Sequence, residues 1–141
     1  MILYLDTSAL VKLYVEEVYS DQVIKQAGRT EISATSRIAY VETLSGIARK
    51  LRDGDMSRKE HEVLLEEFEN DWNNFLVIEV TEEICRISGE LLRSPLLRAF
   101  DAIHLASAVL LRRKIKEDVW FSSFDKLLNV AAQAEGLKNA D

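Results

Sequence analysis

Apolar and polar residues follow two different periods along the chain, and these periods predict strands and helices in turn. The apolar run Ile2–Leu5 is uninterrupted, which is typical of a strand buried on both faces of a sheet. Similar short apolar segments predict strands at residues 31–34, 76–80 and 119–121, and a short edge strand is expected from Leu137 onward. The strand at 76–80 is expected to be buried.

Helical periodicity fills the segments between these strands, with apolar residues at three- and four-residue steps. Helices are predicted at residues 9–14, 20–27, 35/36–52, 57–73, 81–94, 99–114 and 125–134. In the third helix, one apolar face is expected to be shared by Ile38, Val41, Leu44 or Ser45, Ala48 and Leu51. The helix at 99–114 is nearly all apolar in its middle, so deep burial is expected there.

This order of elements predicts the architecture. Strands that alternate with helices indicate a three-layer α/β/α fold around a central parallel sheet. The 141 residues suffice for one hydrophobic core, and no repeat, linker or low-complexity segment interrupts them. We therefore expect a single domain over residues 1–141.

Composition adds three expectations. The single cysteine, Cys85, has no partner for an internal disulfide, which favours a reducing cytoplasm. The sequence has neither an apolar stretch long enough for a membrane span nor a secretory leader at Met1. The net charge of −6 argues against binding nucleic acid by simple neutralisation of phosphates. This negative charge does not exclude an enzyme that binds the phosphates of its substrate through metal ions.

Four acidic residues occupy unusual positions. Asp6 directly follows the first strand, and Asp125 follows the strand at 119–121 at the start of a helix. Asp101 lies near the start of the apolar helix, and Glu42 lies on a helix that could flank the same crevice. Taken singly, the three aspartates could be helix caps or complements to the helix dipole, and Glu42 could be a boundary residue facing water.

Taken together, the four acids indicate a cation site. Ligand crevices in open parallel sheets lie outside the carboxyl ends of the strands. Carboxylates gathered there would repel by roughly 4 kcal/mol per pair at 4 Å, which a cation would offset. Oxygen ligands alone favour Mg²⁺ or Mn²⁺. A zinc site is weakly supported, because His61, His104 and Cys85 lack the spacing of zinc ligands.

Three sequence strings carry a family resemblance that spans almost the whole chain. They are LDTSAL at residues 5–10, FDAIHLA at residues 100–106 and SFDKLL at residues 123–128. With Glu42 between them, they resemble PIN domains, and most closely the VapC-like ribonuclease toxins of prokaryotic type II toxin–antitoxin pairs.

The resemblance implies a PIN-like α/β/α fold and a catalytic site in which Mg²⁺ or Mn²⁺ is bound by Asp6, Glu42, Asp101 and Asp125. Asp125 is the most variable position of the four in such families. Thr7, Ser8 and Ser123 occupy the positions of supporting hydroxyls. The resemblance also implies an RNA substrate, an antitoxin partner, a homodimer and no membrane association.

The resulting hypothesis is a metal-dependent endoribonuclease that hydrolyses RNA phosphodiester bonds as a toxin. One alternative is a catalytically silent PIN-fold module that binds RNA or protein, and a housekeeping ribonuclease would share the same chemistry. A receiver- or phosphatase-type domain is disfavoured, because Ser8 stands where a second acid would follow Asp6. The RNA target is not specified by these residues.

Basic residues supply candidate phosphate contacts. One set comprises Lys12, Arg37, Arg49, Lys50 and Arg52, and a second comprises Arg112, Arg113, Lys114 and Lys116. Both sets could instead complement helix dipoles, and Arg98 could pair with a carboxylate. The apolar residues Leu10, Leu13, Tyr14 and Val15 are expected in the core, with a partner surface as the alternative.

Overall fold

The computed structural model describes residues 1–140 as five strands packed between helices. The strands are β1 (Ile2–Leu5), β2 (Ile32–Ser36), β3 (Leu76–Ile78), β4 (Val119–Ser122) and β5 (Lys138–Asn139). The α-helices are α1 (Thr7–Leu10), α2 (Ser20–Arg29), α3 (Ile38–Arg52), α4 (Arg58–Trp72), α5 (Glu82–Leu91), α6 (Ala99–Ile115) and α7 (Lys126–Ala134), and a 3₁₀ helix, η1 (Val11–Leu13), follows α1.

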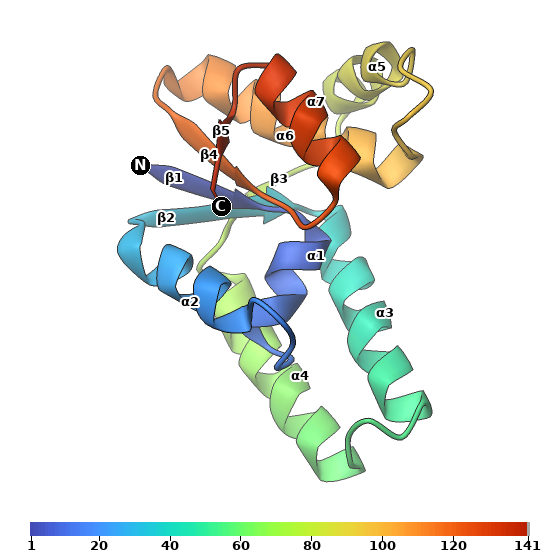
Figure 1. The fold of residues 1–141 in the computed structure, drawn as a ribbon. Coiled ribbons are helices and arrows are strands. Elements are labelled where there is room, and N and C mark those ends of the chain that lie inside the picture. Colours follow the sequence, from blue (N-terminus) through green and yellow to red (C-terminus); the bar gives the residue numbers. More distant parts are fainter. Residues whose placement is uncertain (141) are drawn as a thin grey trace.

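The sheet is parallel throughout, with strand order β3-β2-β1-β4-β5. Helices α1 to α4 cover one face of the sheet and α5 to α7 lie on the other (Figure 1). The predicted three-layer α/β/α fold is therefore confirmed. Among the described residues, no helix is both long and apolar enough to span a membrane.

Alternate residues of β1 enter two separate cores, as expected for a strand covered on both faces. Ile2 and Tyr4 join the core beneath α6 and α7, where the Tyr4 ring lies parallel to the Phe121 ring at 5.5 Å. Leu3 and Leu5 join the core shared with α1, α2 and α4. The central strand thereby fixes the position of its carboxyl end, where Asp6 follows.

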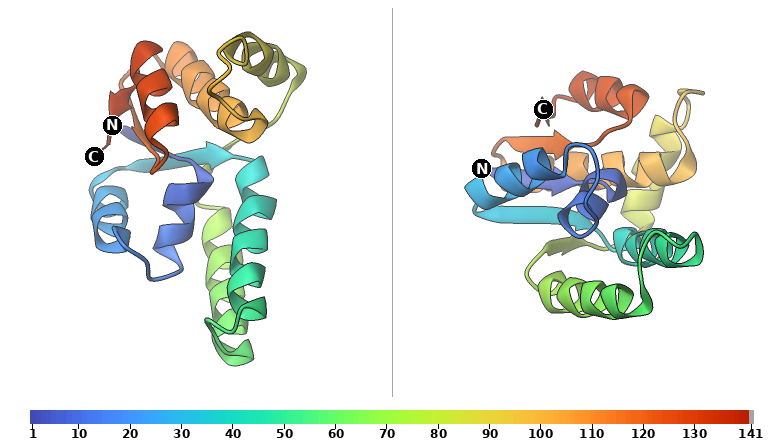
Figure 2. Two further views of the ribbon diagram at one scale, coloured as in Figure 1. Left: turned by 45° about the vertical axis from the view of Figure 1, so that its right-hand side comes forward. Right: turned by 60° about the horizontal axis from the view of Figure 1, so that its bottom comes forward.

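Helices α3 and α4 pack side by side as a hairpin that extends away from the sheet (Figure 2). Ser57 and Glu60 form the predicted capping box at the start of α4. Near the other end of α4, Phe68 and Trp72 are buried against Tyr40 of α3. The α3–α4 hairpin is therefore anchored to the rest of the domain by aromatic packing at the end nearest the sheet.

The predicted apolar face of α3 is correct only in part. Leu44 packs against the core, but Val41 is 60% exposed and Ala48 is also exposed, whereas Ala39, Thr43 and Ile47 have no accessible surface. Helix α3 packs against both α1 and α4, and this packing buries the side that carries Ala39, Thr43 and Ile47.

Two other element predictions need correction. The helix expected at 9–14 begins at Thr7 and changes to 3₁₀ geometry at Val11. The strand expected to be buried at 76–80 is an edge strand that ends at Ile78, with Leu76 39% exposed. Core packing of Leu10, Leu13 and Tyr14 is confirmed.

Candidate active site

The four acids predicted as site residues come from four separate segments and lie toward one end of the sheet. Asp6 follows β1 and caps α1, and Asp125 lies beyond β4 and caps α7. Asp101 is in the first turn of α6, and Glu42 is in the second turn of α3. The parallel sheet explains this convergence, because the carboxyl ends of its strands share one edge.

Asp6 is almost fully buried, at 5% exposure. Its Oδ1 accepts hydrogen bonds from the Ser8 hydroxyl at 2.6 Å and from the Ala9 backbone N–H at 3.0 Å, and the Ser123 hydroxyl also bonds this carboxylate. Burial raises the pKa of Asp6 despite the lowering effect of nearby His104 and of these hydrogen bonds. A cation beside Asp6 would offset this cost of burial.

Glu42 is held through one of its two carboxylate oxygens. Oε1 accepts from the Thr7 hydroxyl at 2.6 Å and lies 2.9 Å from Nε2 of His104. Burial raises the pKa of Glu42, but the hydrogen bonds from His104 and Thr7 outweigh it and leave this pKa below its ordinary value. The carboxylate is therefore ionised and oriented, while neither of these bonds uses Oε2.

His104 is a site residue that sequence reasoning missed. It is buried, and besides Glu42 its Nδ1 lies 2.8 Å from the Tyr4 hydroxyl. Because an ionised carboxylate can only accept, the Nε2 position donates to Glu42, and Nδ1 is left to bond the Tyr4 hydroxyl. The signal that could have found it is its spacing from Asp101, because residues three apart share a helix face.

Arg98 connects the other two acids. Its Nε donates to Asp101 Oδ2 at 3.0 Å, and its Nη2 donates to Asp125 Oδ2 at 3.3 Å. The predicted pairing of Arg98 with a carboxylate is thus confirmed. The guanidinium side chain is 78% exposed, so it bridges the acids at the surface.

The predicted supporting hydroxyls contact the acids. Thr7 bonds Glu42, and Ser8 bonds Asp6 while accepting the backbone N–H of Phe124 at 3.0 Å. The Ser123 hydroxyl accepts the backbone N–H of Asp125 at 3.1 Å. These hydroxyls therefore orient the carboxylates of Asp6 and Glu42, and Ser123 also holds the backbone of Asp125.

The donor chemistry of the site fits a hard divalent cation, because carboxylate oxygens are the ligands such ions prefer. Within residues 1–140, no three His, Cys, Asp or Glu side chains converge closely enough to hold a metal ion in this arrangement. Arg98 instead provides positive charge between two of the acids.

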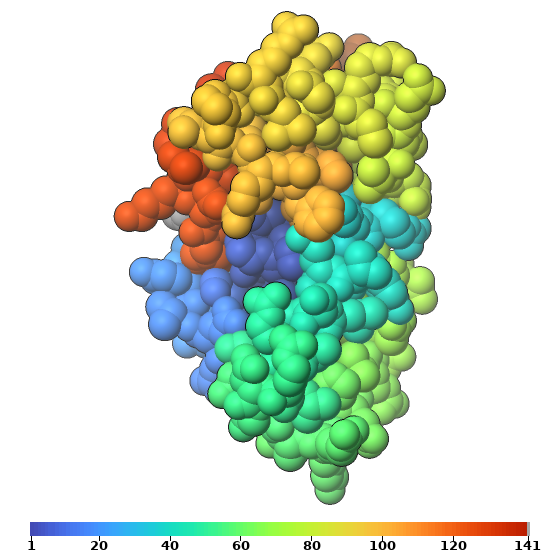
Figure 3. All heavy atoms as spheres, turned by 90° about the vertical axis from the view of Figure 1, so that its right-hand side faces the viewer, coloured from blue at the N-terminus to red at the C-terminus, as the bar shows by residue number. Residues whose placement is uncertain are grey.

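A groove of about 820 Å³ runs along α3 from Glu42, which is the one member of the four acids that lines it. Thr7, Ser8 and Glu42 line one end of it, and Arg49 and Lys50 line the other. In Figure 3 its dark-blue floor, formed by the first residues of the chain, is surrounded by the teal and green α3 and the orange start of α6. The lining of the groove therefore includes residues from the second to the last turn of α3.

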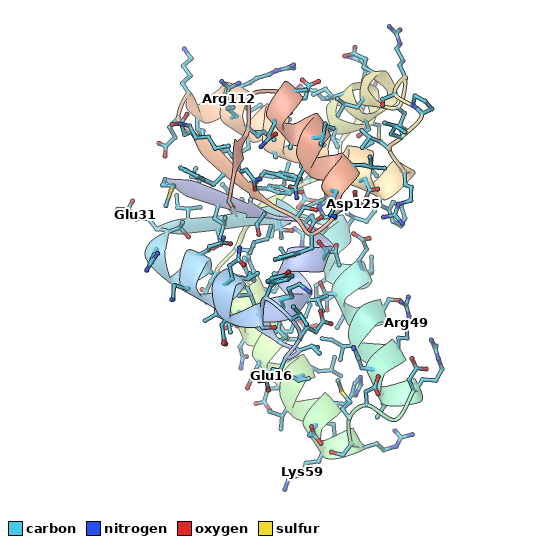
Figure 4. All side chains as sticks on the ribbon, in the orientation of Figure 1. Glu16, Glu31, Arg49, Lys59, Arg112 and Asp125 are labelled. Atoms are coloured by element: carbon cyan, nitrogen blue, oxygen red, sulfur yellow. The ribbon has the colours of Figure 1, made fainter. Side chains whose placement is uncertain are left out.

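The basic residues proposed as phosphate contacts lie in different parts of the structure, and only some of them line the groove. Lys12, Arg49 and Lys50 line the groove, whereas Arg37 pairs with Glu79 outside it. The set that begins at Arg112 ends α6, at the opposite end of this helix from Asp101. Figure 4 shows Arg112 far from Asp125 and Arg49 on the outer side of α3.

Residues 3–133 match the sequence model of a family described as the PIN domain. The chain belongs to the PIN-domain family. This PIN domain is 31% identical to ribonuclease VapC45 of Mycobacterium tuberculosis strain CDC 1551 / Oshkosh, over 99% of this chain and 94% of the relative. The figures are the same for ribonuclease VapC49 of Mycobacterium tuberculosis strain ATCC 25618 / H37Rv.

Solved structures share the fold of this PIN domain. FitAcB from Neisseria gonorrhoeae aligns with a TM-score of 0.68 at 18% identity, over 99% of this chain and 96% of that chain. A toxin–antitoxin complex from Klebsiella pneumoniae aligns with a TM-score of 0.62 at 16% identity, over 92% and 93% of the two chains. At these identities the likeness is one of fold.

Proposed function

We propose that this PIN domain is a metal-dependent endoribonuclease that hydrolyses RNA phosphodiester bonds and is the toxin of a toxin–antitoxin pair. The observation that carries the proposal is that four separate segments bring Asp6, Glu42, Asp101 and Asp125 toward one end of the sheet, where Glu42 lines a groove that also contains Lys12, Arg49 and Lys50. The relatives named ribonucleases, which align over nearly the whole chain, support it.

The four carboxylates would hold Mg²⁺ or Mn²⁺. When bound, such an ion lowers the pKa of a coordinated water and stabilises charge on the phosphoryl oxygens. Asp6 and Glu42 are already oriented by Ser8, Thr7 and His104. Asp101 and Asp125 would exchange their bonds with Arg98 for bonds to the ion.

The groove would bind the RNA strand on either side of the reacting phosphate. Lys12, Arg49 and Lys50 are the groove-lining cations suited to contact its phosphates. The net charge of −6 makes the ion part of substrate binding, since the uncompensated acids would repel RNA.

The decisive experiment is cleavage of single-stranded RNA by the purified protein in Mg²⁺, in Mn²⁺ and in EDTA. We expect cleavage only with the divalent ions, and a loss of at least about 100-fold in rate for Asp101→Asn. Glu66→Gln is the matched control, because this exposed acid lies on α4 away from the groove. Undiminished cleavage in EDTA, or full activity of Asp101→Asn, would overturn the proposal.

RNA cleavage, together with the effect of expression on cell growth, separates the alternatives. A catalytically silent PIN-fold module would bind RNA or protein without cleaving RNA under any of the three conditions. A housekeeping ribonuclease would cleave RNA, but its expression would not arrest growth. A toxin would arrest growth in the wild-type form and not as Asp101→Asn.

We further propose that the protein acts in the cytoplasm as one domain over residues 1–141, as a homodimer that binds an antitoxin. The structural neighbour titled a toxin–antitoxin complex supports the antitoxin. Light scattering on the purified protein tests the dimer. Co-purification with the product of a small neighbouring reading frame tests the antitoxin.

A further inference from the structure

Two stacked aromatic rings lie beside the acids. The rings of Tyr19, which precedes α2, and Phe124, which precedes Asp125, have centroids 5.4 Å apart and planes within 10°. The Lys12 ammonium lies 4.8 Å from the centroid of the Phe124 ring. Tyr19 is 59% exposed, so much of its surface is open to solvent. In Figure 3 the light-blue region at the start of α2 adjoins the red-orange start of α7 at one side of the hollow.

The stack is tied to the candidate active site by hydrogen bonds. The backbone N–H of Phe124 donates to the Ser8 hydroxyl at 3.0 Å, and that hydroxyl donates to Asp6 at 2.6 Å. Lys12, which lies over Phe124, also lines the groove. A group lying against Tyr19 would therefore be close to a phosphate held at the acids.

The backbone of Tyr19 is held in an uncommon conformation. Its φ of 71° and ψ of 6° are left-handed, which is rare for a bulky side chain. The preceding loop is fixed by the Glu17 backbone N–H, which donates to the Ser20 hydroxyl, and by the Lys12 ammonium, which donates to the Glu17 carboxylate. Tyr19 makes no side-chain capping bond to α2, so helix capping does not explain a tyrosine here. Backbone strain of this kind clusters at ligand sites.

We infer that the Tyr19 ring, backed by Phe124, is a stacking platform for one unpaired nucleobase of the RNA strand, next to the phosphate held at the acids. Aromatic rings beside basic side chains are a usual means by which proteins bind unpaired bases. Lys12 would contact a phosphate adjoining that base. This inference rests on the proposed ribonuclease function. It adds a subsite that binds one base of the substrate by stacking.

The test asks whether removing the Tyr19 ring abolishes the effect on KM of removing one particular base from the RNA. The bond that the wild-type protein cleaves is first mapped, and a short single-stranded RNA spanning it is then made with an abasic nucleotide at each flanking position in turn. We expect one abasic substitution to raise the KM of the wild type about tenfold or more, as loss of one stacked base predicts. The same substitution should change the KM of Tyr19→Gly little, because the ring is already absent.

Three variants separate stacking from folding. Tyr19→Gly removes the ring and accepts the left-handed backbone, so it should fold even where Tyr19→Ala is strained. Tyr19→Phe keeps a ring and should retain the wild-type response to the abasic nucleotide. Val18→Ala, which changes an exposed residue in the same loop, should also behave as wild type.

If Tyr19→Gly weakens intact and abasic substrates equally, the ring only supports the fold and the inference is wrong. An unchanged KM combined with weaker antitoxin binding would assign the ring to a protein partner and would also overturn it. If the wild type cleaves no RNA, the proposed function itself fails, and the inference fails with it.

Discussion

Replacing His104 by leucine removes the imidazole N–H that lies 2.9 Å from Glu42 Oε1. His104 is buried and the Glu42 side chain is 23% exposed, so this bond to a charged group is partly shielded from water. Such bonds contribute about 1.5–3 kcal/mol to stability. We expect a coupling energy of that size between His104→Leu and Glu42→Met in a double-mutant cycle.

The assay is urea unfolding of the four proteins in EDTA, followed by tryptophan fluorescence and far-UV circular dichroism. The pKa of Glu42 lies below its ordinary value of 4.5 in the folded protein. The stability that the carboxylate contributes is therefore present above pH 4.5 and is lost as the pH falls through the folded pKa. The coupling should be full at pH 7 and reduced at about pH 3.5.

His104→Gln is the matched control, because its amide can still donate a hydrogen bond to Glu42 and should recover part of the coupling. The reasoning fails if the effects of the two substitutions add to within about 0.5 kcal/mol at pH 7. It also fails if the coupling is the same at both pH values, since the carboxylate charge would then contribute nothing.

Three further predictions concern other parts of the molecule. Because burial raises the pKa of Asp6, the contribution of this residue to the stability of the metal-free protein, measured as wild type minus Asp6→Asn, should fall as pH rises above 3.8. Asp6→Asn should remove this fall and raise the melting temperature at pH 7 in EDTA. Arg98→Ala should tighten Mn²⁺ binding severalfold in titration calorimetry, because the guanidinium no longer competes for Asp101 and Asp125. Phe68→Ala should cost about 3–5 kcal/mol in urea unfolding, since this ring is fully buried.

Each of these predictions has a control and a contrary outcome. An Asp21→Asn change at an exposed acid should leave the pH profile intact, and a difference between wild type and Asp6→Asn that does not change between pH 4 and 7 would contradict the burial argument. Arg86→Ala removes an exposed ion pair away from the groove and should not alter Mn²⁺ binding. Val63→Ala, at a half-exposed position of α4, should cost less than about 1 kcal/mol. A similar cost for Phe68→Ala would contradict the assigned core.

The layer order and the positions of the aspartates could be predicted because they depend on local patterns. A buried strand followed at once by a polar cap defines Asp6, and the same pattern defines Asp125. The buried face of α3 could not be predicted in this way. Residues 39, 43 and 47 and residues 38, 41 and 48 both recur at helical spacings, and only the packing of α1 and α4 against α3 decides between the two sets.

The role of His104 depended on contacts between distant segments. Its partners come from β1 and α3, which lie 62 or more positions away in the chain. No spacing within α6 indicates which polar groups of other elements will meet the ring. The same applies to the Tyr19 ring, whose neighbour Phe124 belongs to the far end of the sequence.

The strand order also determines when the site can form during synthesis. Asp6 is among the first residues made, yet its backbone N–H bonds the carbonyl of Ser122 and its neighbour Leu5 pairs with the same residue. Until β4 has been translated, β1 lacks one of its two neighbours and the acids of α6 and α7 have no fixed place beside Asp6. A growing chain therefore lacks the complete acidic site until β4 and α7 have been made. For a ribonuclease made on an RNA template, this order would delay the completion of the site until well after Asp6 itself has been translated.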